Sequence, residues 1–257
     1  MAKYSHDTVV PYKNSAKSKK EQVASMFDQI AFRYDFLNRF LSGGIDIFWR
    51  KRAIRELKSL GVKKMLDVAT GTGDMAIMSY KYLKPDHITG IDISEGMLEI
   101  GRKKVAKLLL NSHIELLAGD SEAIKSGSDT FDAITVAFGV RNFENLEKGL
   151  GEMYRVLKPG GKMVILEFSK PKRVVFSGLY NMYMNVIAPQ AGKWLSKNKD
   201  AYKYLHSSVK AFPEGETFLH ILQQVGFTDT TLKRLSLGIC TIYCGRKQAS
   251  LRNGQQG

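Results

Sequence analysis

Apolar residues recur at helical spacing in the N-terminal part of the chain. They lie three or four positions apart, at Val23, Phe27, Ile30, Ala31 and Tyr34. This period predicts an amphipathic helix, which the sequence Leu41-Ser-Gly-Gly44 ends because glycine disfavours helical structure. A second, strongly basic helix is expected over residues 46–60, before Gly61. The two helices predict an N-terminal helical cap over residues 23–61.

From Lys63 onward, short apolar runs alternate with helical stretches. The predicted strands are residues 65–69, 88–92, 114–117, 131–136 and 163–166, and the predicted helices are residues 74–82, 94–110 and 145–157. This alternation is typical of parallel βαβ units in an α/β sheet. The turn Lys158–Gly161 is expected to separate the last of these helices from the last strand. A helix over 216–225 follows, and two β-rich runs, 228–235 and 239–245, predict an antiparallel hairpin at the sheet edge.

One domain accounts for most of the chain. We expect it over residues 23–247, between a flexible basic arm at 1–22 and a tail at 248–257. Residues 170–212 interrupt the alternation of strands and helices and predict an inserted lid. Within it, Val174–Gly192 is a run of nineteen residues without a formal charge. Its serine, asparagine, glutamine and proline residues make it too polar for a spanning helix, which needs about 20 mostly apolar residues.

Composition and charge narrow the class of protein. The 257 residues are 44% hydrophobic, which excludes global disorder. Two cysteines, Cys240 and Cys244, are too few for a disulfide scaffold. The polar N-terminus lacks the apolar core of a signal peptide, so we expect a cytoplasmic location. The net charge of +14 favours an anionic partner, either a nucleic acid or a membrane surface, and a solvated basic surface is an equal alternative.

A glycine-rich turn follows the first predicted strand, in the sequence Asp67-Val-Ala-Thr-Gly-Thr-Gly-Asp74. Gly71 and Gly73 let a ligand approach the backbone closely, and the next helix offers free N–H groups at its first turn. The spacing also fits the dinucleotide-binding fingerprint. A tight turn without any ligand remains an alternative, so this motif alone identifies no cofactor.

Carboxylates at the ends of the first three predicted strands narrow the choice of ligand. Asp92 ends the second strand, where an acid can accept hydrogen bonds from both ribose hydroxyls of a nucleotide. Ser94 suits the N-cap of the following helix, which leaves Asp92 available. Asp67 would repel a pyrophosphate but suits an ammonium group, and Asp120 can accept from an adenine amino group. Their joint placement predicts a pocket for a cationic adenosyl ligand.

Longer motifs resemble the class I S-adenosylmethionine-dependent methyltransferases, and within them the ubiquinone/menaquinone biosynthesis C-methyltransferases. The resemblance covers about residues 23–245. Its motifs are Phe27-Asp-Gln-Ile-Ala31 with Tyr34-Asp35 and Asn38, Leu41-Ser-x-Gly44, Trp49-Arg50, Phe138-Gly-Val-Arg-Asn142, Met153–Gly161, Leu166-Glu-Phe-Ser-Lys-Pro171, and Tyr202-x-Tyr-Leu205 with Ser208 and Pro213.

The resemblance implies a fold, a cofactor and a reaction. The fold would be a doubly wound, mostly parallel seven-stranded sheet with the helical cap and the inserted lid. S-adenosylmethionine would bind through Thr72, Asp92 and the pair Asp120-Ser121, together with Asp67, Gly71 and Gly73. Many members have serine where this chain has Ala137, so a side-chain contact there is lost or is replaced by a backbone contact. The reaction would be C-methylation of a polyprenylated quinol, either demethylmenaquinol, which we expect, or a methoxy-polyprenyl-benzoquinol.

The lid suggests a membrane partner. Segment 170–210 holds eight lysine or arginine residues and one acid, Asp200, so it carries half of the excess charge. Its apolar residues share one helical face, at Phe176, Leu179, Tyr180, Tyr183, Val186 and Ile187. A basic helix with such a face suits an anionic membrane surface, and a lid helix packed on the sheet is an equal alternative. We therefore expect peripheral attachment to the inner face of the membrane and leave a homodimer open.

Residues near the predicted crevice are candidates for substrate binding and catalysis. Phe27, Tyr34 and Asn38 of the cap are expected to hold the quinol. Arg141, just after the fourth strand, is expected to stabilise the quinolate. Asp74 is expected to relay a proton or to orient Arg141. The alternative is an Arg141–Asp74 ion pair that only fixes the loop. Truncation of Arg141 should then lower turnover and leave the melting temperature nearly unchanged.

Other classes of function are weaker. The five histidines show no metal-ligand spacing, so we expect no metal site. We expect no nucleic-acid partner, but an RNA methyltransferase and a non-catalytic adenosine-binding module stay open as alternatives.

Overall fold

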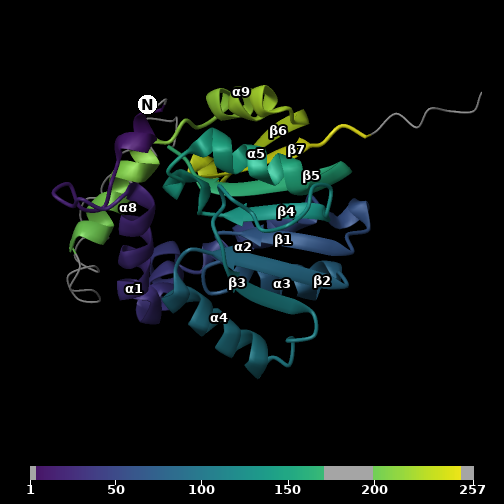
Figure 1. Ribbon diagram of the computed structural model, residues 1–257, viewed down its shortest axis with the longest axis horizontal. Helices are drawn as coiled ribbons and strands as arrows, with labels where there is room; N and C mark the ends of the chain where they lie inside the picture. Colours follow the sequence, from purple (N-terminus) through teal and green to yellow (C-terminus); the bar gives the residue numbers. More distant parts are fainter. Residues whose placement is uncertain (1–3, 171–198, 250–257) are drawn as a thin grey trace, which may run out of the picture.

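A seven-stranded sheet forms the centre of the fold (Figure 1). The computed structural model describes residues 4–170 and 199–249. The strands are β1 Lys64–Val68, β2 His87–Asp92, β3 Ile114–Ala118, β4 Phe131–Ala137, β5 Leu157–Phe168, β6 Thr228–Leu235 and β7 Cys240–Arg246. Their order is β3-β2-β1-β4-β5-β7-β6. The first five strands are parallel, and β7 is antiparallel to both β5 and β6. This confirms the α/β fold and the C-terminal hairpin at the sheet edge.

Strand β5 begins earlier than the sequence predicts. Phe131 of β4 pairs with Leu157, whereas Ala133 pairs with Lys162, so the expected turn at 158–161 is a bulge inside the strand. Gly160 has a left-handed backbone, with φ of +78°. The bulge keeps its hydrogen bonds because the Gly160 N–H donates to the Lys247 carbonyl, at 2.9 Å.

Seven α-helices surround the sheet in the described residues. They are α1 Lys19–Ser42, α2 Ile45–Arg55, α3 Asp74–Leu83, α4 Glu95–Lys107, α5 Leu146–Val156, α8 Lys199–Ala211 and α9 Glu216–Val225. The Ser94 hydroxyl accepts a hydrogen bond from the Met97 N–H, so Ser94 is the N-cap of α4, as predicted. Helix α2 is shorter than predicted, because the chain leaves the α-helix after Arg55 and forms a 3₁₀ turn, Lys58–Leu60, before Gly61.

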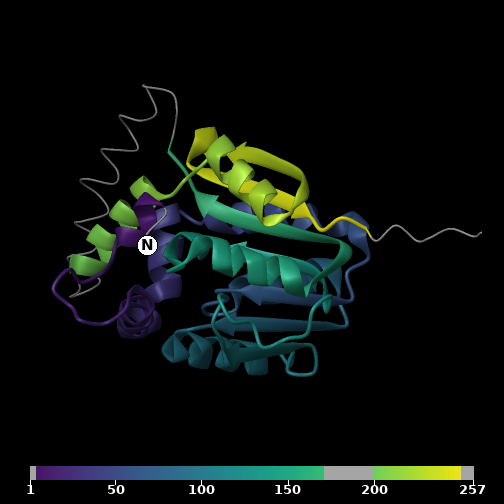
Figure 2. The same cartoon turned by 45° about the horizontal axis from the view of Figure 1, so that its top comes forward.

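Helices lie on both faces of the sheet (Figure 2). Leu66 and Val68 of β1 pack in a core with α5 and α9, whereas Met65 packs in a second core with α2, α3 and α4. A third, smaller cluster joins α1 and α8 beyond the sheet, through Val23, Met26, Ala201 and Tyr204. Helices α1 and α8 therefore lie side by side at one end of the strands.

The N-terminal segment is packed where the sequence predicts a flexible arm. Helix α1 already begins at Lys19, and the Tyr4 hydroxyl donates to Glu147 of α5, at 2.6 Å. His6 is fully buried, with its ring 6.0 Å from that of Phe212. Tyr4 and His6 therefore anchor the start of this segment against the domain.

Much of the predicted lid lies outside the described residues, including the uncharged run 174–192 and its apolar face. Its last part forms α8. No helix within residues 4–170 and 199–249 is long and apolar enough to cross a membrane.

Candidate functional site

A pocket of about 650 Å³, open to solvent, lies at the carboxyl ends of the parallel strands. Strands β1 and β4 are neighbours there, and the chain leaves them toward opposite sides of the sheet, which is where open α/β sheets bind ligands. The pocket is lined by residues from the strand ends and from α1. Those that the sequence predicts for the site are Phe27, Tyr34, Gly71, Asp92, Asp120 and Ser121.

Asp92 fixes the glycine-rich turn against the end of β2. Its Oδ2 accepts a hydrogen bond from the Gly71 N–H at 2.8 Å, and its Oδ1 accepts one from the Ser94 N–H at 2.9 Å. Burial raises the pKa of Asp92, and these backbone hydrogen bonds only partly offset the effect. Each carboxylate oxygen keeps a lone pair, so Asp92 can still accept hydrogen bonds from a ligand.

Asp67 lies beneath the pocket and is not part of its lining. Its side chain is fully buried, and it accepts hydrogen bonds from the hydroxyls of Thr70 and Thr135, each at 2.6 Å. Burial raises its pKa to about 6, although both threonine hydroxyls favour the ionised form. A direct contact between Asp67 and a ligand ammonium stays a prediction.

Asp120 meets a residue of α1 that the sequence analysis did not single out. Its Oδ2 accepts from Lys20 Nζ at 2.6 Å, and its Oδ1 accepts from the Glu122 N–H at 2.9 Å. Lys20 also reaches Glu122, at 3.2 Å. The acid predicted to bind adenine is therefore already paired with the helical cap. A lysine in a polar segment gives no signal of this partner in the sequence.

Thr72 and Gly73 stabilise the glycine-rich turn through contacts outside the pocket. The buried Thr72 hydroxyl donates to Asp35 of α1 at 2.5 Å, and it accepts from Lys104 of α4 at 3.1 Å. Gly73 has φ of +78°, which favours glycine, and an added Cβ would lie 3.2 Å from the Leu116 side chain. Neither residue lines the pocket, and a contact of Thr72 with the cofactor stays a prediction.

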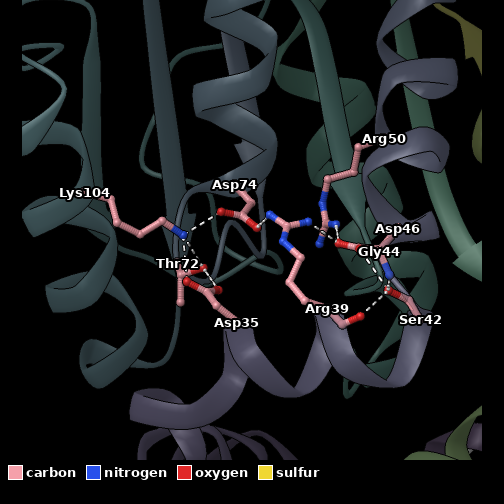
Figure 3. A network of polar contacts seen from close by, with 9 residues as sticks. All are labelled: Asp35, Arg39, Ser42, Gly44, Asp46, Arg50, Thr72, Asp74 and Lys104. Carbon is pink, nitrogen blue, oxygen red and sulfur yellow. Dashed lines mark hydrogen bonds and ion pairs between the residues drawn. The ribbon is translucent and has the colours of Figure 1, made fainter.

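Asp74, at the start of α3, is held by two cations (Figure 3). Its Oδ1 accepts from Lys104 at 2.5 Å, and its Oδ2 accepts from Arg39 at 3.0 Å. Burial by itself would raise its pKa, but Lys104, Arg50 and Arg39 outweigh burial and lower it. A general base works best with a pKa near the operating pH. The environment of Asp74 therefore favours a permanent charge over proton transfer.

Arg141 makes a different ion pair from the one considered in the sequence analysis. Its Nη1 donates to Glu167 Oε1 at 2.8 Å and also to the Phe138 carbonyl. Arg141 is 4% exposed and Glu167 is 0% exposed. Its Nε is buried and has no hydrogen-bond partner. Arg141 and Asp74 thus have separate partners, and neither lines the pocket. Glu167 was missed, although a lone acid within an apolar strand is a signal for a buried partner.

Aromatic residues also line the pocket. The rings of Phe27 and Tyr34 on α1 meet edge to face, with their centroids 5.8 Å apart. Phe138 lines the pocket after β4 and stacks on Phe168 at 4.5 Å. The side chain of Asn38, also predicted to bind substrate, lies outside the described part of the chain. The pocket therefore combines hydrogen-bonding carboxylates with flat apolar rings.

Comparison with known proteins accounts for the whole domain. Residues 15–247 match the ubiE/COQ5 methyltransferase family. A "Demethylmenaquinone methyltransferase" from Bacteroides fragilis is 48% identical over 244 residues, covering 95% of this chain and 99% of the relative. A "Ubiquinone/menaquinone biosynthesis C-methyltransferase UbiE" from Geotalea daltonii is 47% identical over 230 residues, covering 89% of this chain and 97% of the relative.

Among solved structures, the fold is similar to that of a putative S-adenosyl-L-methionine-dependent methyltransferase from Methanococcus maripaludis. The TM-score is 0.59 at 20% identity, and the match covers 93% of this chain and 98% of that one. The match over nearly the whole domain and the high identity to two full-length relatives lead to one conclusion. The chain belongs to the ubiE/COQ5 methyltransferase family.

Proposed function

We propose that the protein transfers a methyl group from S-adenosylmethionine to a ring carbon of demethylmenaquinol, which yields menaquinol. The observation that carries the proposal is the single pocket that joins Asp92 and Asp120 to the aromatic rings of Phe27 and Tyr34. A polar nucleoside and a flat apolar ring can meet there. The full-length match to a relative named for demethylmenaquinone supports the choice of substrate.

The residues present fit an adenosyl cofactor. Asp92 has free lone pairs for the ribose hydroxyls, Asp120 and Ser121 would bind the adenine, and Ile93 and Met97 add apolar surface to the same pocket. Close approach at the turn is possible because Gly71 carries no side chain and has φ of +56°. When bound, S-adenosylmethionine supplies an electrophilic methyl group on a cationic sulfur.

The protein's part in the reaction is to orient the quinol and to stabilise its ionised form. A phenolic hydroxyl with a pKa near 10 is mostly protonated at pH 7, and loss of its proton makes the adjacent ring carbon nucleophilic. We assign the stabilising charge to Arg141, since its Nε is unpartnered and both Gly139 and Asn142 beside it in sequence line the pocket. Alignment of the methyl group with the ring carbon provides much of the remaining acceleration.

A direct assay decides between the two quinols. Methyl transfer from labelled S-adenosylmethionine is measured with demethylmenaquinol and with 2-methoxy-6-polyprenyl-1,4-benzoquinol side by side. We expect the higher kcat/KM with demethylmenaquinol. Preference for the benzoquinol would support the alternative, which is compatible with the double name of the Geotalea relative. No transfer to either quinol would refute the proposal.

We further propose that segment 170–210 attaches the protein to an anionic membrane, where a polyprenylated quinol resides. Eight basic residues against one acid support this, at about 1 kcal/mol for each basic residue near the surface. Changing Lys193, Lys197 and Lys199 to glutamate should release the protein from acidic vesicles in co-sedimentation and spare turnover of a short-chain soluble quinol. Unchanged co-sedimentation would contradict the proposal.

A further inference from the structure

Different side chains of helix α1 contact two different parts of the site. Phe27 and Tyr34 line the pocket on the side assigned to the quinol. Asp35 and Arg39, one and five positions after Tyr34, instead contact the elements that carry the glycine-rich turn (Figure 3). One helix therefore links the residues that line the pocket for one ligand to those that support the turn for the other.

Asp35 makes the most direct link to the turn. Its Oδ1 accepts a hydrogen bond from the Thr72 hydroxyl at 2.5 Å, and its Oδ2 accepts from Lys104 Nζ at 2.8 Å. Thr72 is only 3% exposed, so its buried hydroxyl would lose its acceptor if Asp35 were removed. Asp35 and Lys104 are partly exposed, with side chains 36% and 28% accessible, so their ion pair by itself adds little stability.

Lys104 extends the link beyond the turn. Its Nζ also donates to Thr72 and to Asp74, so one ammonium group holds three acceptors from α1, the turn and α3. From Asp74 the contacts continue through Arg39 to Asp46, as Figure 3 shows.

The far end of this network reaches the aromatic side of the pocket. Asp46 pairs with Arg50 of α2. The guanidinium carbon of Arg50 lies 5.4 Å from the ring centroid of Phe138, which lines the pocket. Three carboxylates and three cations alternate along the whole network, so it is electrically balanced.

We infer that Asp35 is a positioning residue that couples the binding of the methyl donor to the binding of the quinol. The inference rests on the proposed function of the pocket. A ligand that orders the turn also orders α1 through Asp35, and a second ligand on the α1 wall then loses less conformational freedom on binding. Coupling of this kind is reciprocal. It is measured as the ratio between the affinity for one ligand in the presence of the other ligand and the affinity in its absence.

The test measures this ratio in a complex that does not react. The affinity of S-adenosylhomocysteine, which has no methyl group to transfer, is measured by calorimetry with and without a short-chain demethylmenaquinol. In the wild type we expect the quinol to tighten this affinity by roughly 5-fold or more, the lower range of allosteric coupling. In Asp35→Ala the ratio should fall to about 1, and in Asp35→Asn, which keeps an acceptor for Thr72, it should be intermediate.

Two further variants separate positioning from stability. Lys104→Met should lower the ratio as Asp35→Ala does, and it keeps the proposal testable if Asp35→Ala fails to fold. Asp132→Asn is the matched control, because Asp132 accepts from Lys158 Nζ at 2.6 Å and from the Lys64 N–H at 2.7 Å, at the opposite ends of the strands. It should lower the melting temperature without changing the ratio.

The outcomes distinguish this inference from the proposed function. A folded Asp35→Ala protein with the wild-type ratio would overturn the coupling role, and so would a wild type whose two ligands bind independently. A purely structural role would weaken both ligands equally and leave the ratio unchanged. A wild type that binds no S-adenosylhomocysteine, or methylates no quinol, would instead refute the proposed function on which the inference rests.

Discussion

Replacing Arg141 by alanine should destabilise the protein, which reverses the expectation from the sequence. Arg141 is 4% exposed and pairs at 2.8 Å with Glu167, which is 0% exposed. Truncation of Arg141 leaves a buried carboxylate without its cation, and breaking a buried pair in this way costs about 3–5 kcal/mol. For a domain of this size, 1 kcal/mol shifts the melting temperature by about 2–4 °C. The variant should therefore melt roughly 6–20 °C below the wild type.

A double variant separates the loss of stability from any loss of catalysis. Arg141→Met with Glu167→Gln keeps similar side-chain volumes and leaves no buried charge, so it should recover most of the melting temperature that Arg141→Ala loses. If Arg141 stabilises the quinolate, this double variant should still turn over about 10²-fold more slowly than the wild type, although its stability is restored.

Thermal denaturation and initial-rate methyl transfer test both statements. An Arg141→Ala protein that melts within about 2 °C of the wild type would refute the buried ion pair as a source of stability, because that shift corresponds to no more than about 1 kcal/mol. A stable double variant with normal turnover would refute the catalytic assignment of Arg141.

Two further predictions concern buried carboxylates of the site. Asp92→Ala should weaken S-adenosylmethionine binding, measured by calorimetry, by about 1.5–3 kcal/mol for each charge-assisted hydrogen bond lost. The wild type should not bind NAD. Measurable NAD binding would contradict the cofactor assignment. Asp67 has a pKa raised from 3.8 to about 6, so the fold favours its protonated form, and the stability this gives is present below pH 4 and is lost as pH rises through 6. At about 1.4 kcal/mol per pKa unit, the stability of Asp67→Asn relative to that of the wild type should increase by about 2 kcal/mol from pH 4 to pH 7, measured as unfolding free energy in urea titrations. A pH-independent difference would show that Asp67 titrates normally.

Patterns that depend on local spacing were enough to predict six of the residues that line the pocket. Apolar runs that end in an acid or a glycine located the ends of β1 and β2, and parallel strands bring such ends to one edge of a sheet. That is why Gly71, Asp92, Asp120 and Ser121 line one pocket. The aromatic spacing of Phe27 and Tyr34 placed both on one face of a helix for the same local reason.

Partners far apart in sequence could not be predicted in this way. Arg141 and Glu167 lie 26 positions apart, and Thr72 and Asp35 lie 37 apart. Pairing between such residues depends on how the cap and the strands pack. The early start of α1 has the same origin, because Lys19 is buried and its Nζ donates to the His6 carbonyl at 2.7 Å. Tertiary contacts, rather than helical periodicity, extend the helix there.

The order of the strands has a consequence for how the protein folds. The last strand, β7, lies between β5 and β6, and it pairs with seven consecutive residues of β5, from Lys162 to Phe168. Until β7 arrives, β5 is an open edge with unpaired N–H and C=O groups and an apolar surface on both faces. Such edges pair readily with other chains. Chains that lack residues 240–246 should therefore aggregate during folding, even though every residue of the pocket precedes them in the sequence.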